Sequence, residues 1–388
     1  GKRHKLIALV LGLALFNIAG AQVADSTTEA QPSCVRIKTV SIAQLPLGFN
    51  WLQSEVQALI GQCLTPENLQ NLLRQTTNAL AARGYLTSRF YVPEQDAGAG
   101  DLQLLFIPGR VNDIKVTGGQ LNASRVLPLK TGDILNTRAT DQATDTLRRL
   151  TSLNAKMLVE PAENPGQSNL TIALTPTGRA YHGSLSVGQD DLNRDFVQVT
   201  DLPPAAQQLI QLPFQAAVDI DNPLKQGDVF SLNAVVSPGA LFKDGGTLSL
   251  GGRYSLPMGY NLLGFGGSYT VNHSLQKGYN GNLDYNGKSA NMNVDISRVV
   301  MRDERHTVNL SQKFNVGLAW SYIDDQEIGV QRKNTYRSVT GITYAYNTPE
   351  TQFSVGLNNA LTYNDFLNLP QTSGWSDVIQ PTINYNHN

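Results

Sequence analysis

The stretch VNLSQKFNVGLAWS, residues 308–321, alternates apolar and polar residues and decides the fold class. Its apolar positions are Val308, Leu310, Phe314, Val316, Leu318 and Trp320. Successive side chains of a β-strand point to opposite faces of the sheet, so the stretch predicts a strand with one apolar and one polar face. A soluble β-sandwich has strands with the same alternation, and the rest of the chain must decide between the two.

Strands of this kind recur through residues 181–388, and we expect ten of them, from Tyr181 to about Tyr385. The eighth strand is expected from about Ile328 to Tyr346. Short connections are expected after strands two, four, six and eight. Long connections are expected after strands one, five and nine. The connections after strands three and seven should be of intermediate length. Transmembrane β-barrels have short periplasmic turns and longer external loops, so this rhythm favours a barrel in lipid.

Composition supports a membrane location and excludes some partners. Only 16% of the 388 residues are charged, which is low for a soluble surface. The net charge of −1 predicts no nucleic-acid partner. After the N-terminus no apolar run approaches the roughly 20 residues of a spanning helix, so strands must cross the membrane. Outer-membrane lipid is therefore an expected partner.

The N-terminus has the pattern of a secretion signal. Lys2, Arg3 and Lys5 form a basic start, residues 6–16 are almost continuously apolar, and Ala19-Gly20-Ala21 fits a cleavage site. The alternative, a membrane anchor, needs a longer apolar run. We therefore expect a signal peptide at residues 1–21 and a short linker at residues 22–33.

Two small modules of the same order, β-α-α-β-β, are expected at residues 34–110 and 111–178. In the first, Thr65-Pro66-Glu67 predicts a helix start, and Gly84 lies where a helix end needs a left-handed residue. In the second, a helix is expected from Thr137 to Leu150, and strands at 156–160 and 170–174. The repeat of one unit predicts two similar domains in tandem before the barrel.

The two cysteines of the chain are Cys34 and Cys63, both in the first module. In an exported protein a disulfide between them is the natural interpretation; two free buried thiols are the alternative. No catalytic residues are predicted, because none of the five histidines lies in a nucleophile or metal motif. There is no phosphate-binding loop either, so we expect no nucleotide, metal or other cofactor.

Four stretches resemble the outer-membrane transporters of two-partner secretion. These stretches are residues 150–174, Ser297–Asp303 (SRVVMRD), Tyr322–Glu327 (YIDDQE) and the turn Asn222-Pro223-Leu224. The two modules resemble POTRA domains of that family. The resemblance implies a fold of periplasmic α+β POTRA repeats followed by an all-β transmembrane barrel. It also implies export of one large unfolded client, an adhesin, haemolysin or inhibition toxin, through the barrel pore of the outer membrane.

The family pattern differs from this chain in two respects. The family barrel has sixteen strands, so we expect residues 179–388 to be the N-terminal part of a barrel. The linker at 22–33 is too short for the family's plug helix, so either the plug is lacking or cleavage occurs elsewhere. The alternative functions are a barrel-assembly factor, which usually carries more modules, a passive porin, and, least favoured, an enzyme.

By resemblance to POTRA domains, the middle strand of each module should lie at a sheet edge, where an extended client can add as a further strand. We therefore expect client contact in the second module, at its middle strand and at the end of its long helix. The candidate residues are Arg148, Arg149, Lys156, Leu158 and Glu160. The alternative for the two arginines is that they only complement the negative end of the helix or stay solvated.

Overall fold

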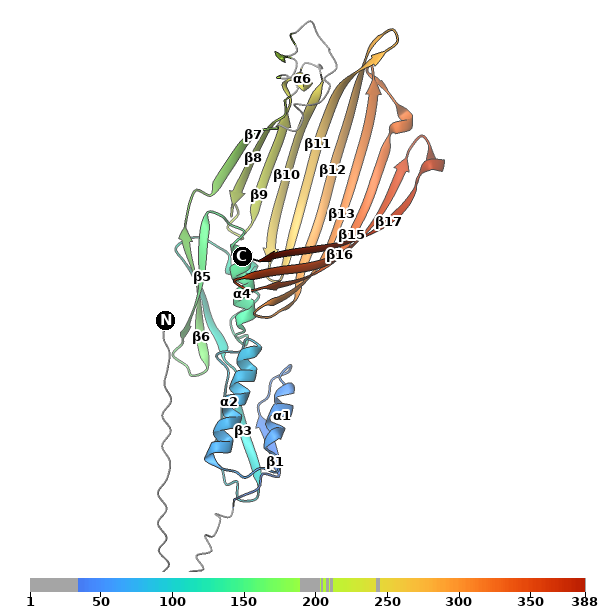
Figure 1. Ribbon diagram of the computed structural model, residues 1–388. Coiled ribbons are helices and arrows are strands. Elements are labelled where there is room, and N and C mark those ends of the chain that lie inside the picture. Colours follow the sequence, from blue (N-terminus) through green and yellow to red (C-terminus); the bar gives the residue numbers. More distant parts are fainter. Residues whose placement is uncertain are drawn as a thin grey trace, which may run out of the picture.

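The computed structural model describes residues 34–188, 212–241 and 245–387, together with residues 203, 205, 206 and 209. The expected signal peptide and linker lie outside the described residues. Figure 1 shows two small modules, one below the other, beneath a tall curved sheet. The expected boundaries between modules and sheet, at residues 110/111 and 178/179, stay predictions.

The first module is a three-stranded sheet covered by two helices. The strand order is β1-β3-β2, with β1 parallel and β2 antiparallel to the central strand. The elements are β1 (Thr39–Ala43), α1 (Trp51–Val56), the 3-10 turn η1 (Gln57–Leu59), α2 (Pro66–Ala82), β2 (Arg89–Tyr91) and β3 (Asp101–Ile107). The helices bury side chains such as Leu52, Leu72 and Leu80 against the sheet. The expected order β-α-α-β-β is confirmed.

Helix α2 begins and ends where its sequence predicts. The hydroxyl of Thr65 accepts a hydrogen bond from the amide of Asn68 at 3.2 Å, which satisfies one of the unpaired donors of the first turn. Gly84 follows the helix with a φ of +90°, a conformation that costs other residues free energy. Residues next to the helix therefore set where α2 begins and ends.

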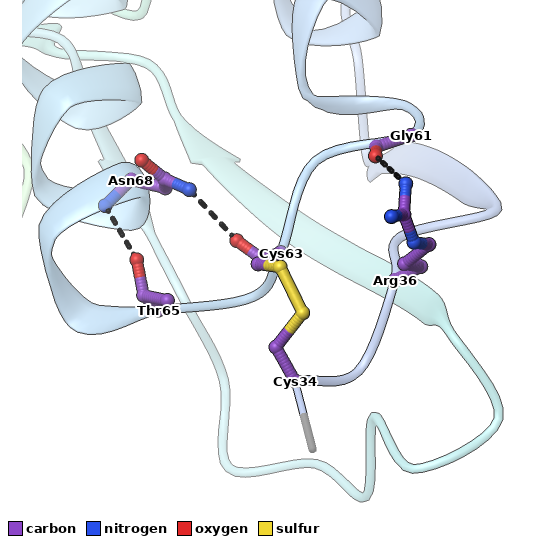
Figure 2. Close-up of a disulfide and its surroundings, with 6 residues drawn as sticks. All are labelled: Cys34, Arg36, Gly61, Cys63, Thr65 and Asn68. Atoms are coloured by element: carbon purple, nitrogen blue, oxygen red, sulfur yellow. Dashed lines mark hydrogen bonds between the residues drawn. A yellow bond between two sulfur atoms is a disulfide. The ribbon is translucent and has the colours of Figure 1, made fainter. Parts of the chain in front are cut away.

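Cys34 and Cys63 form the expected disulfide, with their Cα atoms 5.4 Å apart (Figure 2). The side-chain amide of Asn68 donates to the carbonyl of Cys63 at 2.9 Å, and the guanidinium of Arg36 donates to the carbonyl of Gly61. The disulfide thus ties the segment before β1 to the start of α2.

The second module repeats this topology with strand order β4-β6-β5. Its elements are β4 (Arg110–Thr117), α3 (Ala123–Val126), α4 (Thr137–Leu147), β5 (Leu153–Pro161) and β6 (Gln167–Pro176). Helix α4 ends at Leu147 rather than Leu150, and Arg148 is its C-cap. Strand β5 is longer at both ends than expected, because its ladder with β6 continues through Leu153 and Pro161.

Ten strands form one antiparallel sheet in sequence order, which confirms the expected number. They are β7 (Tyr181–Val187), β8 (Phe214–Asp221), β9 (Val229–Val236), β10 (Gly246–Met258), β11 (Asn261–Gly278), β12 (Gly281–Arg302), β13 (His306–Ile323), β15 (Lys333–Asn347), β16 (Thr351–Phe366) and β17 (Gly374–His387). A two-residue strand, β14 (Gln326–Glu327), pairs with β13. Within the described residues β7 and β17 are not paired with each other, so the sheet is open (Figure 1).

Three connections differ from the expectation. Strands β11 and β12 continue to a turn at Tyr279 and Asn280, so the long loop expected after the fifth strand is a strand hairpin. Many residues of its outer part are polar, which hides the alternation although the backbone ladder continues. The connection after β16 is only 367–373, and it contains the 3-10 turn η3 (Pro370–Thr372). The eighth strand begins at Lys333, after the 3-10 turn η2 (Gly329–Gln331), and not at Ile328.

The two faces of the large sheet differ in polarity. On β12 the side chains of Met292, Val294 and Ile296 are exposed on one face. The opposite face carries polar residues, among them Asp295, which forms an ion pair with Arg253 of β10 at 2.7 Å. In a barrel the apolar face contacts lipid and the polar face lines the lumen. No helix in the described part is both long enough and apolar enough to cross a membrane.

Candidate client-binding strand and its anchorage to the barrel

Strand β5 lies at an edge of the second module's sheet, as expected for the middle strand. One side pairs with β6 from Leu153, opposite Pro176, to Pro161, opposite Ser168. Among the described strands none pairs with its other side. A nine-residue strand therefore presents unpaired backbone donors and acceptors, which is a template for an added strand.

The other edges of the two modules are shorter or covered. The segment after α3 covers the start of the eight-residue strand β4, because the amide of Val111 donates to the carbonyl of Asp133 at 2.9 Å and that of Gly132 to the carbonyl of Val111 at 2.8 Å. In the first module β2 has three residues and β1 has five. The side chain of Gln53 also donates to the carbonyl of Val40 on β1 at 2.8 Å. Strand β5 is thus the longest open edge of the two modules.

The side chains of β5 divide between core and solvent. Ala155 and Met157 pack against the core of the module. Lys156, Leu158 and Glu160 are exposed, and Leu158 is 43% exposed. Val159 is also 42% exposed, so the last part of the strand extends beyond the core. This part can therefore be contacted on both faces as well as along its edge.

The two candidate arginines point to different places. Arg148 is exposed and forms an ion pair with Asp145 at 2.7 Å. Arg149 donates to the hydroxyl of Ser255 in strand β10. Burial lowers the pKa of the Arg149 guanidinium, and the positive charge of Arg253 acts in the same direction. The structure therefore brings Arg149 to the barrel and not to the free edge of β5.

A second contact joins helix α4 to the barrel. Arg302, at the end of β12, donates to the side-chain oxygen of Gln142 at 3.0 Å and forms an ion pair with Asp145. Burial raises the pKa of the neighbouring Asp141 carboxyl, although the charge of Arg302 opposes this. Figure 1 shows α4 directly beneath the sheet.

A third contact involves the turn between β8 and β9. The carboxylate of Asp221, 3% exposed, accepts a hydrogen bond from the amide of Ser152 at 2.8 Å. The side chain of Asn222 donates to the carbonyl of Gln120 at 3.0 Å. Backbone hydrogen bonds from Asn122 to Lys225 and from Gly259 to Arg125 also join the two parts. Three contacts made by side chains thus help to hold the second module under the periplasmic end of the sheet. We call them the barrel anchors: Arg149–Ser255, Arg302 with Gln142 and Asp145, and Asp221–Asn222 with Ser152 and Gln120.

The barrel anchors were not predictable as contacts from the sequence. Asn222 and Arg302 lie in two of the stretches that carried the family resemblance, which was the only available signal. Sequence spacing could not show their partners, since Arg302 and Asp145 are 157 residues apart in the chain. In the described part no group of three or more histidine, cysteine or acidic side chains could hold a metal ion.

Comparison with known proteins agrees with this architecture. The family described as haemolysin secretion/activation protein ShlB/FhaC/HecB matches residues 210–387, and the ShlB-type POTRA domain matches residues 36–109. The outer membrane transporter CdiB-2 of Burkholderia pseudomallei is 23% identical over 82% of this chain and 53% of its own length. The hemolysin transporter protein HpmB of Proteus mirabilis is 24% identical over 84% of this chain and 52% of its own.

The fold is also that of a solved transporter. The structure of CdiB from Escherichia coli superposes with a TM-score of 0.72 at 19% identity, covering 88% of this chain and 61% of that one. The chain spans about half the length of the curated relatives it matches. Two POTRA modules before an antiparallel transmembrane sheet, and both family matches, lead to one conclusion. The chain belongs to the family described as haemolysin secretion/activation protein ShlB/FhaC/HecB, an outer-membrane family with periplasmic POTRA domains.

Proposed function

We propose that the protein exports one large secreted protein, an adhesin, haemolysin or inhibition toxin, and that β5 is the strand on which this client first binds. The observation that carries the proposal is the nine-residue open edge of β5, in a module that three contacts hold beneath the barrel. The relatives are named as a CdiB transporter and a hemolysin transporter, which supports this class of client.

Strand addition suits an unfolded client of varied sequence. An extended segment pairs with the edge through main-chain hydrogen bonds, and only alternate side chains meet the module. Each such bond contributes a net of about 0.5–1.5 kcal/mol, so a short segment binds weakly enough to be released. Lys156 and Glu160, of opposite charge, flank the exposed Leu158 and would select amphipathic segments.

The barrel anchors would direct the bound client toward the lumen of the barrel. They keep β5 at a constant position relative to the sheet, so that a released segment is close to the lumen. The polar residues of the inner face, such as the Arg253–Asp295 ion pair, would limit lasting apolar contact with an unfolded chain. In this proposal Arg148 remains a client contact at the exposed end of α4, whereas Arg149 acts through the anchorage.

We also propose that this function needs no catalytic step and no bound nucleotide or cofactor. The match to a transporter family supports this proposal and favours export over barrel assembly, the alternative considered above. If the protein assembled barrels instead, its deletion would lower the amounts of other outer-membrane proteins and leave secretion of a neighbouring-gene exoprotein intact.

The test is a pair of proline substitutions in the complete gene, Leu158→Pro and Val159→Pro. Along an edge strand alternate amides point toward the neighbouring strand and away from it, so one substitution removes an outward donor and the other breaks the pairing with β6. The variant with the outward change should keep the module folded and lose export of the client. Hydrogen exchange of β6 identifies which variant this is.

The matched control is Arg89→Pro on β2, the middle strand of the first module. Export should fall in the outward β5 variant and stay at the wild-type level in an Arg89→Pro protein whose first module remains folded. Full export by the folded β5 variant would exclude β5 as the client-binding edge. Loss of export in both would assign client binding to the pair of modules and not to β5.

A further inference from the structure

A cationic cleft lies where the second module meets the barrel wall. It consists of two adjoining cavities of about 580 and 640 Å³, both lined by Tyr260 and Arg298. Module two contributes residues from α3, α4 and the segment between them, and the barrel contributes the turn after β10 and the end of β12. This cleft is separate from the β5 edge, and it adjoins one of the barrel anchors, because Arg302 is among its lining residues.

Four of the five cations that line the cleft form no ion pair in the described part, and the fifth, Arg302, pairs with Asp145. Among the described ion pairs none involves Arg125, Lys130, Arg138 or Arg298, all of which line the cleft. Arg125, Arg138 and Arg298 donate only to neutral oxygens, those of Gln226, Ala82 and Asn261. The one acidic lining residue is Asp133, whose carboxylate accepts a hydrogen bond from the backbone amide of Lys130 at 2.8 Å.

Part of the cleft lining lies on the outer face of the sheet. Arg298 follows Met292, Val294 and Ile296 at every second position of β12, which places it on the same apolar, exposed face. Met258, Val300 and Met301 line the cleft and are 41%, 48% and 49% exposed. Cations and exposed apolar side chains are thus adjacent, at the periplasmic border of the lipid-facing wall.

The turn residue Tyr260 adds a hydrogen-bond donor. Its side chain is half-buried between the cations of the two parts. Burial raises the pKa of the phenol, so the hydroxyl stays protonated and able to donate at neutral pH. Guanidinium groups and a phenol around one space are donors that suit a phosphate group.

We propose that this cleft binds the headgroup of an anionic phospholipid in the periplasmic leaflet of the outer membrane. The phosphate lies among Arg138, Arg298 and Tyr260, and the acyl chains run along Met301 and the apolar wall above it. A lipid fits better than an acidic client segment because the cations adjoin the outer wall and its exposed apolar side chains. The bound lipid joins module two to the barrel, in addition to the barrel anchors.

The experiment measures lipid retention by the complete protein in neutral detergent, using native mass spectrometry with phosphatidylglycerol and with phosphatidylcholine of the same acyl chains. We expect one phosphatidylglycerol to be retained and phosphatidylcholine to be lost. The variant Arg138→Gln/Arg298→Gln should weaken phosphatidylglycerol binding about 30-fold, as expected for two cationic contacts. The conservative variant Arg138→Lys/Arg298→Lys should keep most of it.

The charge-matched control is Arg74→Gln/Arg89→Gln in the first module, which removes two positive charges far from the cleft and should leave binding unchanged. Equal retention of the two lipids, or wild-type binding by Arg138→Gln/Arg298→Gln, would overturn the proposal. Displacement of the lipid by millimolar inorganic phosphate would reduce the cleft to a simple anion site. Displacement by a polyglutamate peptide at equal concentration would reassign it to an acidic protein segment.

Discussion

The two POTRA modules have the same topology and differ in their edges and attachments. Both place the third strand at the centre, parallel to the first and antiparallel to the second. The first module has a three-residue middle strand and a disulfide. The second has a nine-residue middle strand, and it supplies the barrel anchors. The same topology can therefore leave either a short or a long strand edge open for pairing.

The junction between the modules shows how they are kept in line. The amide of Thr137 donates to the carbonyl of Gly84 at 2.9 Å, and the side chain of Asn136 donates to that of Arg83 at 3.2 Å. A Cβ at Gly84 would collide with the side chain of Asn136. The end of α2 thus contacts the start of α4, so hydrogen bonds to the second module keep the first module in line with it.

The largest loss of stability should come from Gly118→Ala. This substitution tests how strongly the stability of the second module depends on the close packing just after β4. Gly118 has a φ of +76°, and a Cβ there would collide with the backbone carbonyl of Leu174. We expect a loss of about 4 kcal/mol or more, because the colliding atom is backbone and cannot move aside. Hydrogen exchange of β6 in the complete protein measures this loss.

Gly132→Ala is the matched control, since Gly132 has a φ of +92° and open space around it. Gly132→Ala should lower the stability of the module by only about 1–2 kcal/mol, the cost of a left-handed backbone at a residue other than glycine. Equal effects of the two substitutions would mean that close packing at Gly118 is unimportant.

The next effect concerns the first module alone. Replacing Cys34 and Cys63 by serine opens a loop with a sequence separation of 29 residues. Loop-closure entropy predicts a loss of about 3–4 kcal/mol. Exchange of α2 amides should accelerate, whereas exchange of α4 and β6 should stay as in the wild type. Acceleration of α4 by the same factor would show that the modules unfold together.

A smaller effect is expected from Arg302→Ala, which removes the anchor between β12 and α4. Asp145 is 38% exposed, so we discount the usual cost of breaking a buried pair to about 2 kcal/mol. Spin labels at Thr144 and Asp303 should show a broader distance distribution. Arg305→Ala, in the same turn, should leave the distribution narrow; broadening by that control would point to the turn itself.

The smallest effects compare the two helix caps. Thr65→Ala removes only the cap of α2 and should cost about 1 kcal/mol. Asn136→Ala removes the cap of α4 and also the bond to Arg83, so we expect about 2 kcal/mol. Thermal unfolding of both variants checks the difference. If the two losses were the same, the inter-module bond would contribute nothing measurable.

Sequence determined the features whose cause is local. Ten strands were predictable because a strand between lipid and a polar lumen must alternate, as residues 308–321 do. The ends of α2 were predictable because Thr65 and Gly84 act on backbone groups within a few residues. The edge position of β5 followed from the family resemblance, and the use of its residues in client binding stays a prediction.

Tertiary structure decided two kinds of feature. These are contacts between residues far apart in the sequence, and strands that meet water on both faces. The β11–β12 hairpin was missed because its outer part does not show the alternation that reveals a strand. Arg149 looked like a client contact because a helix end gives no information about Ser255, 106 residues later. Local patterns report which side of an element meets water, whereas the anchors and the cationic cleft arise only when the folded chain brings module and barrel together.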